Sequence, residues 1–146
     1  MSEEIYKSNA DRNVKYSSLL WHRIVRMYKH NTKETNHLLN ELHLSNAQFD
    51  VISRVAESSR VSQQELADKL LVTKGNITQL LQKLEQMNLI KKEKEWKTNY
   101  ISLTNEGKDV YDKVTPILRE FQFSYFSNLT QAEKKQLLHL LRKVQE

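Results

Sequence analysis

Only two glycines and one proline interrupt the 146 residues of this chain, and this shortage of helix breakers is the strongest constraint on its fold. Chains built from many short strands need turn residues at frequent intervals, whereas long helices do not. The sequence therefore predicts a mainly α-helical protein. Its length fits one domain of ordinary size, or one domain with an added oligomerisation element.

The chain is basic, with a net charge of +5. A positive excess is compatible with a polyanionic partner such as nucleic acid, although many proteins are mildly basic. The excess is spread along the sequence rather than concentrated in one segment. A DNA-binding patch would therefore have to arise by folding or by the pairing of two subunits.

Cysteine is absent, which excludes disulfides, Cys-based zinc sites and thiol redox sensing within this chain. No apolar run approaches membrane-spanning length, and the N-terminal "MSEEIYKSNADRN" lacks a signal-peptide core. We expect a cytoplasmic protein with no membrane partner and no cofactor, and with a frayed first dozen residues. Metal binding is not expected either. The histidines do not form a pair spaced four residues apart with a carboxylate nearby in the sequence; they are His22, His30, His37, His43 and His139.

Apolar residues recur at helical spacing through most of the chain. This periodicity predicts a long first helix over roughly 14–42 and further helices over 46–57, 63–71, 73–87, 105–127 and 131–144. Pro116 lies inside one of them and predicts a kink there.

Capping signals mark the starts of these helices. Ser45, Ser62 and Thr130 are each followed three residues later by Gln or Glu, the spacing of a capping box. Thr73 is a fourth candidate cap. One such match is common by chance, but several followed by apolar periodicity favour real helix starts.

The period changes after Leu89. The segment "IKKEKEWKTNYISLT" predicts two short strands with a turn near Trp96–Asn99, in which Ile101 and Leu103 share a face. Its length predicts a small β-hairpin and not a sheet.

Residues 61–89 carry the pattern of a helix-turn-helix. The apolar positions Leu66, Leu70, Ile77 and Leu80 fall where two steeply crossing helices meet, and the small Ala67 allows close approach. An ordinary helical hairpin is the alternative on these residues alone. The basic hairpin that follows favours a winged helix-turn-helix.

The outward face of helix 73–87 is suited to reading DNA. Asn and Gln pair with adenine edges, Lys reaches guanine or phosphate, and the open helix start favours a phosphate. Gly75, costly inside a helix, indicates close approach of some backbone. A solvated face with a tolerated glycine is the alternative. Seven DNA contacts are predicted on this helix: Thr73, Lys74, Gly75, Asn76, Thr78, Gln79 and Lys83. Two lysines of the hairpin, Lys94 and Lys97, are also predicted to contact DNA.

The sequence resembles the multiple-antibiotic-resistance regulator (MarR) family of bacterial transcription factors. The resemblance covers nearly the whole chain, and its most specific pieces are "QKLEQMNLI" after the reading helix and "LTNEG" after the hairpin. It implies a homodimer that binds double-stranded DNA at a near-palindromic operator, most commonly as a repressor.

Some positions depart from the family pattern. The wing of the family usually carries Asp-x-Arg, where this chain has Glu95 and Lys97, and Lys is a flexible point charge rather than a planar fork. Gln79 stands where the family often has Arg. Asn88 stands where a Gly is common, and Asn tolerates a left-handed conformation.

The apolar faces of the terminal helices exceed what one domain needs, and intramolecular packing alone is the alternative to a dimer. We expect residues 1–44 and 106–146 to form a helical dimerisation region around a DNA-binding domain over 45–105. The resemblance also implies that a small phenolic or aromatic effector relieves DNA binding. Candidate lining residues, each also explicable as core or surface, are Tyr16, Trp21, His22, Arg23, Phe49 and Tyr111.

An enzyme and a protein-binding adaptor are the two alternatives to a regulator. No glycine-rich phosphate loop, nucleophile motif or metal-ligand cluster points to an enzyme. A helical adaptor that binds only protein remains the alternative function, and it would show no preference for a DNA sequence.

Overall fold

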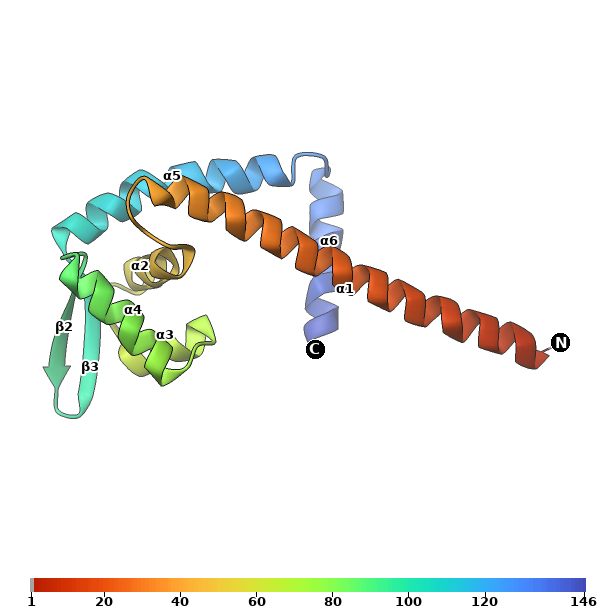
Figure 1. Cartoon of the computed structure of the whole chain (residues 1–146), viewed down its shortest axis with the longest axis horizontal. Helices are drawn as coiled ribbons and strands as arrows, with labels where there is room; N and C mark the ends of the chain where they lie inside the picture. Colours follow the sequence, from red (N-terminus) through yellow and green to blue (C-terminus); the bar gives the residue numbers. More distant parts are fainter. Residues whose placement is uncertain (1) are drawn as a thin grey trace. The chain divides into compact units, whose positions relative to one another are not determined.

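The computed structural model describes the backbone of residues 2–146 and the side chains of residues 8–146. Clustering of the backbone gives two compact units, one ending at Asn46 and the other spanning Ala47–Glu146. The elements, labelled in Figure 1, are α1 (Ser2–Asn40), α2 (Asn46–Ser58), β1 (Val61–Ser62), α3 (Gln63–Leu70), α4 (Lys74–Gln86), β2 (Ile90–Glu95), β3 (Thr98–Leu103), α5 (Asn105–Tyr125) and α6 (Gln131–Gln145).

Helix α1 is longer than predicted. It spans 39 residues and begins at Ser2, so the predicted start near residue 14 was wrong, while the fraying of the first dozen residues stays a prediction. That segment is polar, but it contains no glycine or proline, and a helix formed downstream extends readily through such residues. The helix ends at Asn40, where His43 adopts a left-handed φ of 56° and the Leu44 amide donates to the Leu39 carbonyl at 3.3 Å.

The other helices lie close to their predicted bounds. The Ser62 hydroxyl accepts from the Glu65 amide while the Glu65 carboxylate accepts from the Ser62 amide, and Thr130 and Glu133 form the same reciprocal pair. Both capping boxes are therefore confirmed. Thr73 caps α4 as predicted, whereas the box at Ser45 and the kink at Pro116 stay predictions.

The strands form a three-stranded antiparallel sheet in the order β1-β3-β2. The hairpin of β2 and β3 is confirmed, but the expectation of a hairpin without a sheet was wrong. Val61 pairs with Ile101 and Ser62 with Tyr100. A strand of two residues carries no periodic signal, and its partner lies about forty positions away, so only tertiary pairing reveals it.

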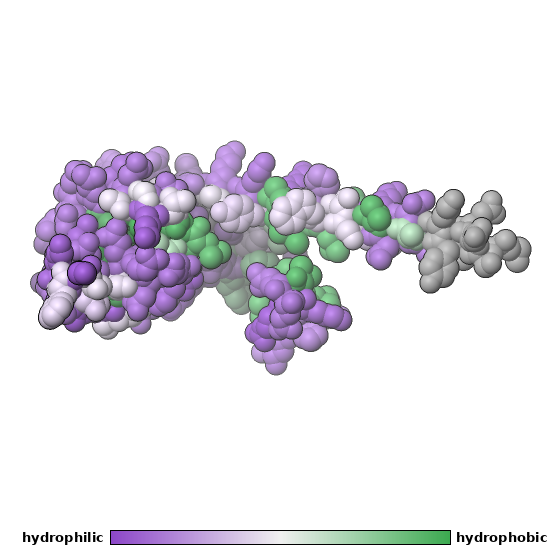
Figure 2. Space-filling view, turned by 90° about the horizontal axis from the view of Figure 1, so that it is seen from below, coloured by the Kyte–Doolittle hydropathy of each residue, from purple (hydrophilic) through white to green (hydrophobic). Residues whose placement is uncertain are grey.

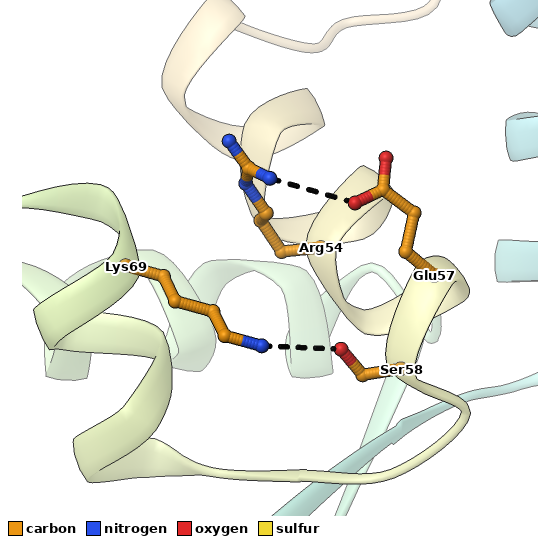
Figure 3. Close-up of polar contacts among 4 residues, drawn as sticks. All are labelled: Arg54, Glu57, Ser58 and Lys69. Carbon is orange, nitrogen blue, oxygen red and sulfur yellow. Dashed lines mark hydrogen bonds and ion pairs between the residues drawn. The ribbon is translucent and has the colours of Figure 1, made fainter.

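The core of the second unit is formed by α2, α3, α4 and the base of the sheet. Ile52, Leu66, Leu81, Leu84 and Ile101 are fully buried. Ala67 is 4% exposed, which confirms the close crossing of the two helices for which a small residue was predicted. On the surface, Lys69 of α3 donates to Ser58 at the end of α2, beside the Arg54–Glu57 ion pair within α2 (Figure 3).

Large apolar side chains remain exposed on three helices. Figure 2 shows apolar groups along α1, the helix that ends in the grey residues. None of the described side chains of α6 is buried. The exposed apolar residues of these helices include Val14, Tyr16, Leu20, Trp21, Tyr28, Phe123, Leu138 and Val144.

Candidate nucleic-acid interface

Helix α4 presents an open N-terminal end. The Thr73 hydroxyl accepts from the Asn76 amide at 3.2 Å, and Ile77 begins the regular pattern by donating to the Thr73 carbonyl. The amides of Lys74 and Gly75 lie in the first turn, where helix geometry provides no intrahelical acceptor. These donors and the positive end of the helix dipole suit an anion such as a phosphate.

A groove of about 330 Å³ opens beside this helix end. The start of α3, the first half of α4 and the start of β3 contribute its lining, so the helix-turn-helix and the wing meet there. Its lining residues, all in the described part of the chain, include two lysines and no Asp or Glu: Gln63, Gln64, Ala67, Lys74, Ile77, Thr78, Lys97, Thr98 and Asn99. The groove therefore has the charge expected for a polyanion.

The predicted reading residues are distributed around this groove. Lys74, Thr78 and Lys97 line it. Thr73 at the cap of α4, Lys94 on β2 and four residues of α4 are exposed outside the lining of the groove; the four are Gly75, Asn76, Gln79 and Lys83.

The hydroxyl of Thr78 has two partners inside the protein. It donates to the Lys74 carbonyl at 2.7 Å and accepts from Nε2 of Gln63 at 3.0 Å. Each hydroxyl has one donor hydrogen, so the donor capacity of Thr78 is used within the chain. A partner outside the chain can therefore contact the methyl group of Thr78, but cannot receive the hydrogen of its hydroxyl while these bonds persist.

Sequence reasoning missed Gln63, Gln64, Thr98 and Asn99. Gln63 and Gln64 directly follow the Ser62 cap of α3, and in a helix-turn-helix the start of the first helix lies near the start of the second. That signal was present in the sequence. Thr98 and Asn99 could be placed only once the strand register was known.

The end of β2, next to the tip of the wing, is joined to the chain before α3. Nη2 of Arg60 lies 2.6 Å from a carboxylate oxygen of Glu95, and the guanidinium lies 3.8 Å from the centre of the Tyr100 ring. The hydrogen bond to Glu95 raises the pKa of the Arg60 guanidinium above its ordinary value. Through these two contacts the guanidinium joins both strands of the wing, Glu95 on β2 and Tyr100 on β3.

The "LTNEG" segment has a structural explanation. Thr104 caps α5 by accepting from the Gly107 amide at 3.0 Å, and its hydroxyl donates to the Asn88 carbonyl at 2.7 Å. Asn88 has the left-handed φ expected for it, 58°. A Cβ at Gly107 would lie 2.0 Å from the Leu89 carbonyl oxygen, so only glycine lets α5 begin this close to the wing.

The predicted effector residues lie in both units. Tyr16, Trp21, His22 and Arg23 are exposed on α1, while Tyr111 is half-buried on α5. Phe49 is 4% exposed and belongs to the core. Among the described residues no group of three or more His, Cys, Asp or Glu has a metal-binding arrangement, and no helix is long and apolar enough to cross a membrane.

Known proteins that are similar to this chain in sequence include transcriptional regulators of the helix-turn-helix (HTH) type. Residues 44–95 match the sequence model of the MarR family. An uncharacterised HTH-type transcriptional regulator of Bacillus cereus is 36% identical over 128 residues, which is 87% of each chain. The HTH-type transcriptional regulator SarZ of Staphylococcus epidermidis is 27% identical over 113 residues, or 75% of each chain.

Solved structures with lower identity share the fold. A variant of Escherichia coli MarR complexed with operator DNA has a TM-score of 0.79 and 22% identity, over 86% of this chain and 92% of that one. BpsR of Bordetella bronchiseptica, whose DNA binding is regulated by 6-hydroxynicotinic acid, has a TM-score of 0.75 and 20% identity, over 84% and 91%. At this identity the likeness supports the winged-helix fold.

Proposed function

The chain belongs to the MarR family of transcriptional regulators, and on that premise we propose that it is a sequence-specific double-stranded DNA-binding protein that works without catalysis in the cytoplasm. The observation that carries the proposal is the groove between α3, α4 and β3, which holds Lys74 and Lys97 and no acidic side chain among its described lining residues. In this proposal α4 enters the major groove with Asn76 and Gln79 at base edges. Lys97 then follows the backbone or the adjacent minor groove.

We propose further that the protein acts as a homodimer on a near-palindromic operator. Two copies would place two α4 helices about 34 Å apart, one helical turn of DNA. The exposed apolar side chains of α1 and α6, such as Trp21 and Leu138, support this part, because apolar surface of that extent favours burial against a second subunit. The dimerisation region would comprise residues 1–44 and 106–146, around a DNA-binding domain over 45–105.

Repression relieved by a small phenolic or aromatic molecule completes the proposal. The candidate contacts are those predicted from the sequence: Tyr16, Trp21, His22, Arg23, Phe49 and Tyr111. A panel of aromatic acids that includes 6-hydroxynicotinic acid tests it. A ligand of this site should raise the unfolding temperature of the protein and dissociate its DNA complex at the same concentration.

Selection of bound duplexes from a random DNA pool tests the function itself. The expected result is one enriched sequence with two inverted half-sites about one turn apart. An adaptor that binds only protein would enrich no sequence, and its weak binding would disappear with added salt. A reporter gene placed behind the enriched site then shows whether the protein represses it.

A further inference from the structure

The tip of the wing carries an exposed tryptophan. Trp96 and Lys97 connect β2 to β3, whose last register pair is Glu95 with Thr98. The Trp96 residue is 96% exposed. Tryptophan is buried to a large extent in most folded proteins, so a fully exposed indole at a loop tip is unusual.

The backbone at Trp96 is also unfavourable for this residue. Its φ is 58°, in the left-handed region that bulky side chains rarely adopt. Gly, Asn and Asp are the usual residues at such positions in two-residue hairpins, and the chain itself uses Asn88 at the same φ. Fold stability therefore does not explain tryptophan here, and an unfavourable conformation held at an exposed site indicates function.

The surroundings of Trp96 indicate the kind of partner. Lys97 directly follows it and Lys94 lies two residues before it, and Lys97 shares with Lys74 of α4 the groove that has no Asp or Glu among its described lining residues. The neighbouring residue, Glu95, is held by Arg60 at 2.6 Å, so the tip extends from an anchored strand. A planar apolar group among cations suits a partner with anionic charge and planar apolar surfaces, which describes nucleic acid.

We propose that Trp96 is a DNA-contacting residue that inserts its indole into the minor groove when α4 occupies the adjacent major groove. The indole packs against deoxyribose and base edges, while Lys97 neutralises a nearby phosphate. This proposal rests on the proposed function, since it requires the wing to dock on duplex DNA. Apolar side chains that enter the minor groove also widen it and bend the duplex.

The two tryptophans of the chain, Trp21 and Trp96, allow a direct spectroscopic test. Trp21→Phe leaves Trp96 as the sole indole in the full-length protein. Quenching by acrylamide, a neutral probe, is measured with and without the duplex enriched by selection. The expected result is that acrylamide quenches Trp96 severalfold less in the complex. Netropsin, which occupies the minor groove, should restore the quenching.

The variant Trp96→Asn tests whether Trp96 contributes to DNA binding without contributing to the stability of the fold. Asn suits the left-handed backbone, so the urea midpoint of unfolding should be unchanged or higher. Operator affinity should fall roughly tenfold, the size of losing one stacked aromatic contact. Leu71→Asn is the matched control, because Leu71 is also an exposed apolar residue with a left-handed φ (93% exposed, φ 54°) and does not line the groove. This variant should bind DNA as tightly as the unaltered chain.

Different failures have different meanings. If the unaltered chain binds its operator but acrylamide quenches Trp96 equally in the complex, or Trp96→Asn binds with full affinity, the Trp96 proposal is wrong and the proposed function stands. If the unaltered chain selects no duplex, both proposals are wrong.

Discussion

Arg60 and Glu95 form an ion pair of 2.6 Å that joins the segment before α3 to the last residue of β2. Glu95 stands where the MarR family usually has Asp, two positions before the lysine that lines the groove. The acidic residue of the wing therefore positions the strand, while Lys97 faces the proposed DNA site. Glu95 and Lys97, which stand where the family has Asp-x-Arg, therefore have different roles in the wing.

This pairing predicts a local effect on the wing. Arg60→Ala should speed amide hydrogen exchange in β2 and β3 while changing the unfolding temperature little, because exposed ion pairs add little to global stability. Arg54→Ala is the matched control, since its pair with Glu57 lies within α2. Equal exchange in the wings of both variants would show that Arg60 does not order the strands.

Lys97 should contribute one phosphate contact. Lys97→Ala is expected to weaken operator binding and to lower the slope of log K against log salt by about 0.9. Lys113→Ala removes the same charge from an exposed position on α5 and should leave the slope unchanged. An unaltered slope for Lys97→Ala across a salt titration would remove this residue from the interface.

Asn76 and Gln79 should read base edges. Asn76→Ala and Gln79→Ala are each expected to cost about 1–3 kcal/mol of binding on the selected operator and much less on random DNA. Gln86→Ala, an exposed change at the other end of α4, should cost little on either. Equal losses on both kinds of DNA would show that Asn76 and Gln79 only position the helix.

Thr78 should act through its methyl group, because its hydroxyl already bonds to Lys74 and Gln63. Thr78→Val keeps the methyl group and should retain operator preference, whereas Thr78→Ser should lose affinity. Replacing one operator thymine by deoxyuridine should weaken the unaltered protein but not Thr78→Ser, since both changes remove the same methyl contact. A larger loss for Thr78→Val than for Thr78→Ser would assign the role to the hydroxyl instead.

The two glycines should respond differently to alanine. Gly107→Ala would place a Cβ 2.0 Å from the Leu89 carbonyl oxygen and should lower the free energy of unfolding by about 3 kcal/mol. At Gly75 the nearest atom to a Cβ is 4.0 Å away, so Gly75→Ala should raise it by about 0.4–1 kcal/mol.

Operator binding by the Gly75→Ala variant shows whether the backbone at Gly75 contacts DNA. If a phosphate approaches this backbone, Gly75→Ala weakens operator binding even though it stabilises the fold. Full affinity in that variant would leave Gly75 as a residue tolerated on a solvated face, the alternative considered from the sequence.

Local signals in the sequence predicted most of the elements. The bounds of α2, α3, α4 and α6 follow from caps and apolar spacing, because both are interactions between residues three or four positions apart. The same holds for the wing strands, whose alternation is visible within a few residues. The start of α1 was missed because polar residues without breakers form a helix without showing a periodic pattern.

The sequence by itself determined the fold class, the family and the outward face of α4, since these depend on composition, local spacing and a recognisable run of residues. Tertiary structure decided what those residues can do. It paired Val61–Ser62 with β3, brought Gln63 to the hydroxyl of Thr78, and joined Arg60 to Glu95. Each contact links residues 15 or more positions apart. Periodicity of apolar residues over a short window does not predict such contacts, because only the folded chain brings the groups together.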